Sequence, residues 1–167
     1  NAHISISSSI VREWLEYERT STTVLNAYTQ PPMAEYLSAL EVGLLERSYS
    51  GSFMVMQSSG GTTSSTIARS IPIRTLQSGP AGGAIGAFAL GQKLGLSNLV
   101  SADVGGTTFD VSMVVDGRIL EKSRIDINRR PVLQPSIDIV SVGAAGGSIA
   151  WLDKEGGLQI GPQSAQA

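Results

Sequence analysis

The strongest chemical signal in the chain lies at residues 103–110, which read Asp-Val-Gly-Gly-Thr-Thr-Phe-Asp. A carboxylate ends an apolar run, two glycines bare the backbone, and two hydroxyls follow. Backbone N–H groups approach an anion closely only where no side chain intervenes, and successive N–H groups in a turn form a concave anion site. A carboxylate oxygen is a hard ligand of the kind that Mg²⁺ prefers. The stretch therefore predicts a site for phosphate oxygens and a divalent cation, formed by Asp103, Gly105, Gly106, Thr107, Thr108 and Asp110.

The competing interpretation is a plain tight turn between two strands, for which Gly-Gly alone is sufficient. A plain hairpin needs neither the carboxylates of Asp103 and Asp110 nor the hydroxyls of Thr107 and Thr108. These flanking side chains favour the phosphate site.

Two further glycine clusters carry a similar signal. Residues 78–86 place glycines in the opening turns of an expected helix, where each glycine costs about 1 kcal/mol of helix stability relative to Ala. Close packing against a neighbouring element explains this as well as an anion at the helix N-terminus does. Residues 143–148 add a hydroxyl to a glycine loop. Three clusters together point to a nucleotide, and the candidate ligands they add are Ser78, Gly79, Gly82, Gly83, Gly143, Gly146, Gly147 and Ser148.

Two helices are expected before residues 103–110. The polar run at 20–23 predicts the N-cap of a helix that begins near Val24, and Pro31-Pro32 should interrupt or kink it. Beyond the prolines, apolar residues at helical spacing continue to Leu44. Ser78-Gly79-Pro80 predicts the start of a second helix, which Gly95 ends.

Strands are expected on both sides of residues 103–110 and of residues 143–148, and also earlier in the chain. An antiparallel meander should run through 99–103, 109–115 and 118–125, with Asp116-Gly117 as a two-residue hairpin turn. Further strands are expected at 53–56, 71–76 and 137–142, followed by a hairpin of 150–152 with 158–160. The predicted fold class is α/β, a mixed sheet with an antiparallel meander and packed helices. We expect a helical lead over 1–50 and an α/β lobe over 51–167.

Composition excludes several classes of protein. The 167 residues carry a formal net charge of −2, which provides no basic field for nucleic acid or an anionic membrane. No apolar run reaches the length of a membrane span. The lack of cysteine fits a reducing compartment, so a cytoplasmic location is expected. The chain begins Asn-Ala-His, which suggests a segment of a longer protein.

The three clusters together resemble those of a known family. The motifs are Ser-Gly-Pro-Ala-Gly-Gly at 78–83, the stretch from Asp103 through Val111, and Gly-Ala-Ala-Gly-Gly-Ser-Ile-Ala-Trp at 143–151. With Tyr-Glu-Arg-Thr at 17–20 and Asn-Ala-Tyr at 26–28, they resemble the hydantoinase/oxoprolinase family, in particular its hydantoin-utilisation A subunits. The resemblance covers essentially the whole chain, in order.

This resemblance implies a ribonuclease H-like lobe of the actin/hexokinase/Hsp70-like ATPase type, with ATP and Mg²⁺ in a cleft. Two Asp-x-Gly hairpins clamp the phosphates in that superfamily. The copy at Asp103 would be the second and would orient the metal through water, and the first is expected upstream of Asn1. The residues of the other two clusters would line the rest of the nucleotide cleft.

The resemblance also implies a reaction. Relatives couple ATP hydrolysis to opening a cyclic amide such as hydantoin, N-methylhydantoin or 5-oxoproline, together with a second, B-type subunit. A ketone carboxylase subunit and a kinase-like or regulatory ATPase are the alternatives. The isolated segment should be inactive, and its sequence identifies no catalytic residue. Asn26 and Tyr28 fit helix packing as well as they fit substrate contact.

Overall fold

The computed structural model describes residues 3–165. Contacts within the chain form two compact units, each built from two stretches: Asn1–Gly82 with Glu121–Ile137, and Gly83–Leu120 with Asp138–Ala167. Both units combine helices with antiparallel strands, which confirms the α/β class and the antiparallel meander. The expected domain boundary at residue 50 stays a prediction.

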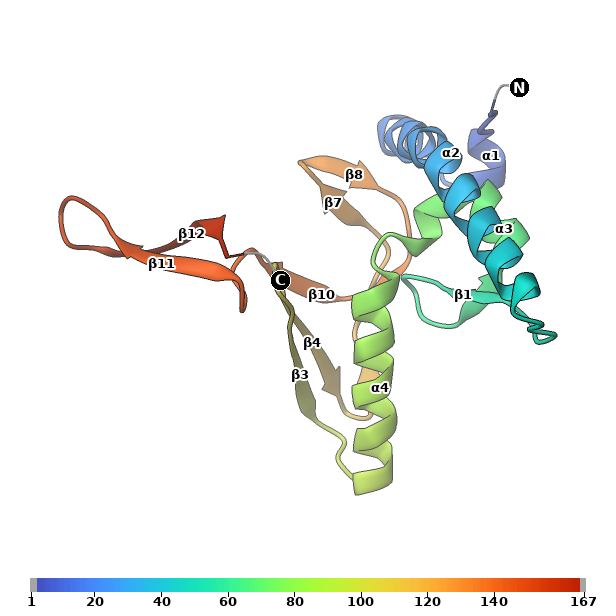
Figure 1. Ribbon diagram of the computed structural model, residues 1–167. Helices are drawn as coiled ribbons and strands as arrows, with labels where there is room; N and C mark the ends of the chain where they lie inside the picture. The colour runs from blue at the N-terminus through green and yellow to red at the C-terminus, as the bar shows by residue number, and fades with distance from the viewer. Residues whose placement is uncertain (1–2, 166–167) are drawn as a thin grey trace. The chain divides into compact units, whose positions relative to one another are not determined.

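The first unit is mainly helical, with short strand pairs (Figure 1). Its buried core is formed by Ile10, Val11, Ile73, Ile125 and Val132. The helices are α1 (Ser7–Ile10), α2 (Glu16–Glu46), α3 (Ser65–Ser70) and the 3₁₀ helix η1 (Pro72–Thr75). The antiparallel pairs are β1 (Met54–Met56) with β2 (Thr62–Ser64), β6 (Glu121–Lys122) with β9 (Ser136–Ile137), and β7 (Ile125–Ile127) with β8 (Arg130–Val132).

Helix α2 differs from its prediction in two ways. It begins at Glu16, well before Val24, and it continues through Pro31 and Pro32. The expected interruption is therefore wrong, because tertiary contacts on both sides of the prolines outweigh their local cost. Before the prolines α2 buries Thr22 and Asn26, and after them it buries Leu37.

Asn26 explains a second correction: the strand expected over 71–76 is absent, and the segment instead contains the 3₁₀ helix η1. Its Oδ1 accepts the backbone N–H of Ile73 at 3.3 Å, and its Nδ2 donates to the carbonyl of Ser70 at 3.2 Å. Ser58 also holds this segment, because its N–H donates to the carbonyl of Arg74 at 2.7 Å. Backbone groups pinned by α2 and by Ser58 are unavailable for pairing with another strand.

The second unit contains most of α4 (Ser78–Leu94) and a small sheet. The sheet has the order β10–β4–β3, with β5 also paired to β4, and a separate hairpin follows. The strands are β3 (Leu99–Val104), β4 (Phe109–Val115), β5 (Arg118–Ile119), β10 (Ile139–Val142), and the hairpin pair β11 (Ser148–Leu152) and β12 (Leu158–Ser164).

Local signals predicted these elements well. Gly95 has φ +70° and ends α4, with the Leu96 N–H bonded to the carbonyl of Gly91 at 2.9 Å. Asp116 and Gly117 both have positive φ, as a two-residue hairpin turn between β4 and β5 requires. The single strand expected over 118–125 is instead divided into β5, β6 and the start of β7. The chain passes from one unit to the other after Leu120, which explains the break.

The two faces of the β10–β4–β3 sheet differ sharply. Leu99 on β3 lies opposite Val114 on β4, and its side chain packs so closely on α4 that Gly91 has no room for a Cβ atom. Helix α4 therefore covers this face. The alternate positions present the other face, which is apolar and open: Val100, Val104 and Val140 are each 60% exposed or more.

Candidate phosphate-binding site

A tight turn joins β3 to β4 at the predicted site. The N–H of Gly105 donates to the carbonyl of Thr108 at 2.9 Å and closes the turn. The hydroxyl of Thr108 donates to Oδ2 of Asp110 at 3.3 Å. Among residues 3–165, the backbone N–H groups of Gly106 and Thr107 have no protein acceptor. The turn thus offers amide donors and hydroxyls to an external acceptor.

The 143–148 loop lies directly against this turn. The N–H of Gly146 donates to the carbonyl of Gly105 at 3.0 Å, and the N–H of Gly147 donates to the carbonyl of Gly106 at 2.9 Å. Ser148 Oγ accepts the N–H of Ala145 at 2.9 Å. Two of the candidate ligand amides are therefore already engaged, and they hold the turn in position.

Helix α4 contributes one glycine to the same place. A Cβ atom built on Gly83 would lie 3.5 Å from Oδ2 of Asp103, so the helix backbone comes close to this carboxylate. The structure thus brings residues of all three clusters together within the second unit. Ser78, Gly79 and Gly82 belong to the first unit. There, a Cβ built on Gly82 would lie 4.0 Å from Cε of Met56.

Two carboxylates face the same side of the hairpin. Asp103 and Asp110 are directly opposed in the β3–β4 register, and opposed residues of an antiparallel pair share a face. Like charges in this arrangement repel each other. Oδ1 of Asp110 is buried and lacks a hydrogen-bond partner within residues 3–165. An orphan carboxylate oxygen beside a second carboxylate fits a hydrated cation.

The described residues hold no cluster of three or more His, Cys, Asp or Glu side chains. Mg²⁺ is bound by one or two carboxylates and keeps several waters, often alongside substrate phosphates. The Asp103–Asp110 pair therefore fits Mg²⁺ better than a metal that requires an all-protein cage.

Among residues 3–165, no helix is long and apolar enough to cross a membrane.

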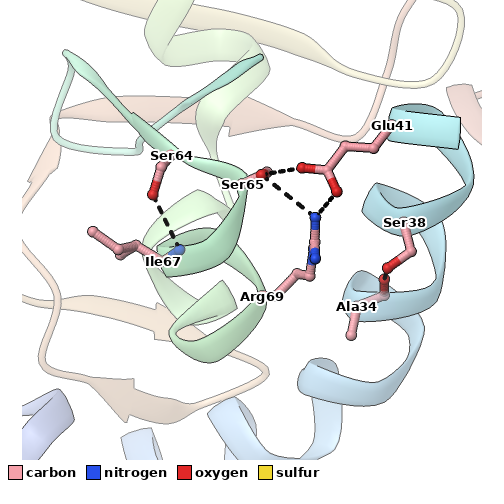
Figure 2. A network of polar contacts seen from close by, with 7 residues as sticks. All are labelled: Ala34, Ser38, Glu41, Ser64, Ser65, Ile67 and Arg69. Atoms are coloured by element: carbon pink, nitrogen blue, oxygen red, sulfur yellow. Dashed lines mark hydrogen bonds and ion pairs between the residues drawn. The ribbon is translucent and has the colours of Figure 1, made fainter. Parts of the chain in front are cut away.

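Polar groups elsewhere act mainly as braces. Asn26 is fully buried and bonded on both sides of its amide, whereas Tyr28 is 78% exposed. Figure 2 shows a second brace, in which Glu41 of α2 accepts from Ser65 and Arg69 of α3. These contacts lower the pKa of Glu41, the Ser65 hydrogen bond most strongly and Arg69 next among the lowering contacts. Glu41 lies 24 positions before Ser65 and 28 before Arg69, so no local spacing in the sequence pairs these residues.

The comparisons with known proteins agree with one another. A family model described as Hydantoinase/oxoprolinase matches residues 19–167. The caprolactamase subunit alpha of Pseudomonas jessenii is 37% identical over 152 residues, which cover 91% of the chain and 22% of that protein. The acetophenone carboxylase gamma subunit of Aromatoleum aromaticum is 39% identical over 164 residues, covering 97% of the chain and 22% of the relative.

A solved structure matches as well. It is the nucleotide-free acetone carboxylase, from work on the mechanism of ATP-dependent acetone carboxylation. The TM-score is 0.83 at 37% identity, and the match covers 96% of the chain and 22% of that protein chain. The chain spans 22% to 26% of the length of the first curated relatives it matches.

Proposed function

Because the chain belongs to the hydantoinase/oxoprolinase family, we propose that it forms half of the phosphate site of an ATP-dependent enzyme that opens cyclic amides. The substrates would be hydantoin, N-methylhydantoin or 5-oxoproline. The observation that carries the proposal is the meeting of three glycine segments at the β3–β4 hairpin: Gly83 lies beside the Asp103 carboxylate, and the 143–148 loop is bonded to the turn. Such a meeting is typical of a backbone-lined anion site.

The proposed fold of the whole lobe is the ribonuclease H-like fold of the actin/hexokinase/Hsp70-like ATPases. The β3–β4 hairpin beside β10, covered on one face by α4, supports this assignment. The other Asp-x-Gly-Gly-Thr hairpin that such a clamp requires, the first in chain order, would be supplied by sequence outside these 167 residues. We therefore propose that the isolated chain does not turn over ATP.

The residues of the turn have separable roles in the proposed site. The free N–H groups of Gly106 and Thr107, with the hydroxyls of Thr107 and Thr108, would bind phosphate oxygens. Asp103 would hold Mg²⁺ through water, and Oδ1 of Asp110 would accept a hydrogen bond from one of these waters. Mg²⁺ would neutralise phosphate charge, which phosphoryl transfer requires more than covalent help from protein.

The remaining cluster residues would act by position. Gly146 and Gly147 would hold the turn through their backbone bonds rather than contact the nucleotide with these amides. A Cβ atom on Gly83 would contact Oδ2 of Asp103, so the glycine would leave this oxygen open to the cation. Gly143 and Ser148, which belong to the same unit as the turn, are proposed to line the rest of the site. The roles of Ser78, Gly79 and Gly82 in the first unit stay a prediction.

The proposed chemistry is phosphorylation of the amide carbonyl oxygen, which turns a poor electrophile into a reactive one. The name of the caprolactamase subunit supports an amide substrate. The same scaffold in a ketone carboxylase is the second candidate, which the acetophenone carboxylase subunit supports. Both relatives are named as subunits, which supports a partner subunit for this protein. We propose that this partner is of the B type and that the protein is cytoplasmic.

The test uses a protein that contains this chain and has the full length of its relatives, together with its partner subunit. Cyclic amides should stimulate ATP hydrolysis, and a ketone with bicarbonate should not. Asp103→Asn should abolish the stimulated turnover, whereas Glu121→Gln, an exposed acid in the first unit, should leave it unchanged. Stimulation of ATP hydrolysis by the ketone with bicarbonate, and not by cyclic amides, would favour the carboxylase. Stimulation by neither substrate would exclude both.

A further inference from the structure

The first unit contains a pocket that the phosphate site does not use. Its volume is about 410 Å³, within the range typical of small-ligand sites. The α1–α2 connection provides Arg12, Glu13 and Leu15, η1 provides Arg74, and the segment after β8 provides Leu133 and Pro135. All these residues belong to one unit, so the pocket is complete within it.

Three sets of contacts fix the walls of this pocket. The N–H of Leu133 donates to Oγ1 of Thr22 on α2 at 2.9 Å. The carbonyl of Arg74 accepts the N–H of Ser58 at 2.7 Å. Ile10 and Val11, which also line the pocket, are part of the buried core. A pocket with pinned walls loses little entropy when a ligand enters.

The charges of the lining are unbalanced. The side chains of Arg12 and Arg74 have no carboxylate partner within salt-bridge distance among residues 3–165. Glu13 supplies the one carboxylate of the lining, so the wall carries a net charge of +1. A guanidinium group is a planar fork that matches a carboxylate in two parallel hydrogen bonds. One net positive charge suits a monoanion, and Glu13 disfavours a dianion such as phosphate.

We propose that this pocket binds a small organic monocarboxylate. The guanidinium groups of Arg12 and Arg74 hold the carboxylate, and Leu15, Leu133 and Pro135 contact its apolar body. The proposal concerns the first unit alone and does not depend on ATP binding at the turn. Failure of either proposal therefore leaves the other unaffected.

The test is calorimetric titration of the 167-residue chain with hexanoate, and with hexanamide as a neutral probe of similar shape. Hexanoate should bind saturably at one site, and hexanamide should bind at least about tenfold more weakly because it lacks the charge-assisted bonds. Arg12→Gln and Arg74→Gln should each weaken hexanoate binding by about tenfold or more. Arg130→Gln changes an exposed arginine of β8 outside the pocket and should have no effect.

Several results would overturn the proposal: no saturable hexanoate binding, equal binding of hexanoate and hexanamide, or full affinity in Arg74→Gln. Displacement of hexanoate by millimolar inorganic phosphate would do the same, since it would mark a phosphate site. Circular dichroism checks that each variant is folded. The comparison of hexanoate with hexanamide uses the unmodified chain and decides the matter even if a variant unfolds.

Discussion

Asp103 and Asp110 occupy directly opposed positions on β3 and β4, so two carboxylates share one face of the same hairpin. Opposed like charges destabilise a strand pair, and a bound cation removes that cost.

This relationship predicts that Asp103→Asn stabilises the Mg²⁺-free chain while it removes the proposed metal ligand. We expect a gain of about 0.2–1 kcal/mol in the free energy of unfolding at low salt, shrinking as salt screens the repulsion. Urea denaturation in the presence of a chelator measures it. Glu121→Gln, whose cross-strand neighbour is Ile137, is the matched control. A loss of stability in Asp103→Asn at low salt would contradict the repulsion.

The same substitution should have different effects on stability at two glycines of α4. A Cβ atom at Gly86 meets nothing within 4 Å, so Gly86→Ala should raise the free energy of unfolding by about 0.5–1 kcal/mol. At Gly91 the same methyl group would strike the side chain of Leu99. Gly91→Ala should therefore lose this gain or destabilise the chain. Urea denaturation of both variants tests the packing of α4 on the sheet, and equal gains would argue against it.

Asn26 should be essential for stability. It joins α2 to the start of η1, and Asn26→Ala leaves the N–H of Ile73 buried without its acceptor. We expect a loss of about 2–3 kcal/mol, the cost of an unsatisfied buried donor together with a lost side-chain bond. Ser38→Ala, on the exposed part of the same helix, should change the free energy by less than about 0.5 kcal/mol. A tolerated Asn26→Ala would return this residue to the list of substrate contacts.

The Glu41 brace should weaken in acid. The hydrogen bond from Ser65 and the charge of Arg69 hold the pKa of Glu41 below its ordinary value of 4.5, so the folded state binds this proton less readily than the unfolded chain. The brace is therefore complete above that value and is lost as the pH falls through the lower pKa of the folded state. Glu41→Gln should flatten this part of the pH–stability profile. Parallel profiles for the variant and the unmodified chain would contradict the assignment.

Local signals were sufficient where they act within a few residues. The glycine at position 95 and the Asp116-Gly117 pair predicted the end of α4 and the β4–β5 turn, because only a few residue types adopt positive φ at low cost. The stretch 103–110 likewise predicted its own hairpin.

Long-range contacts decided the remainder. The uninterrupted path of α2 through Pro31 and Pro32 depends on packing that no local pattern encodes. The use of the Gly146 and Gly147 amides to hold the turn depends on pairing with a distant loop. The pocket that contains Arg12 and Arg74 was not predicted, since its lining comes from segments scattered between Ile10 and Pro135.

The hydrogen bond between Thr22 and Leu133, 111 positions apart, has a consequence for the order of events during synthesis. The first unit needs its returning stretch, Glu121–Ile137, before its core is complete. Because that stretch follows β3 and β4, the ribosome releases the hairpin while α2 still lacks its β8 partner. Contacts between residues near in sequence form fastest, whereas contacts between distant residues form more slowly because closing a long loop costs entropy. We therefore expect the nascent hairpin to form early, and the helical unit to remain vulnerable to proteases until residue 133 emerges.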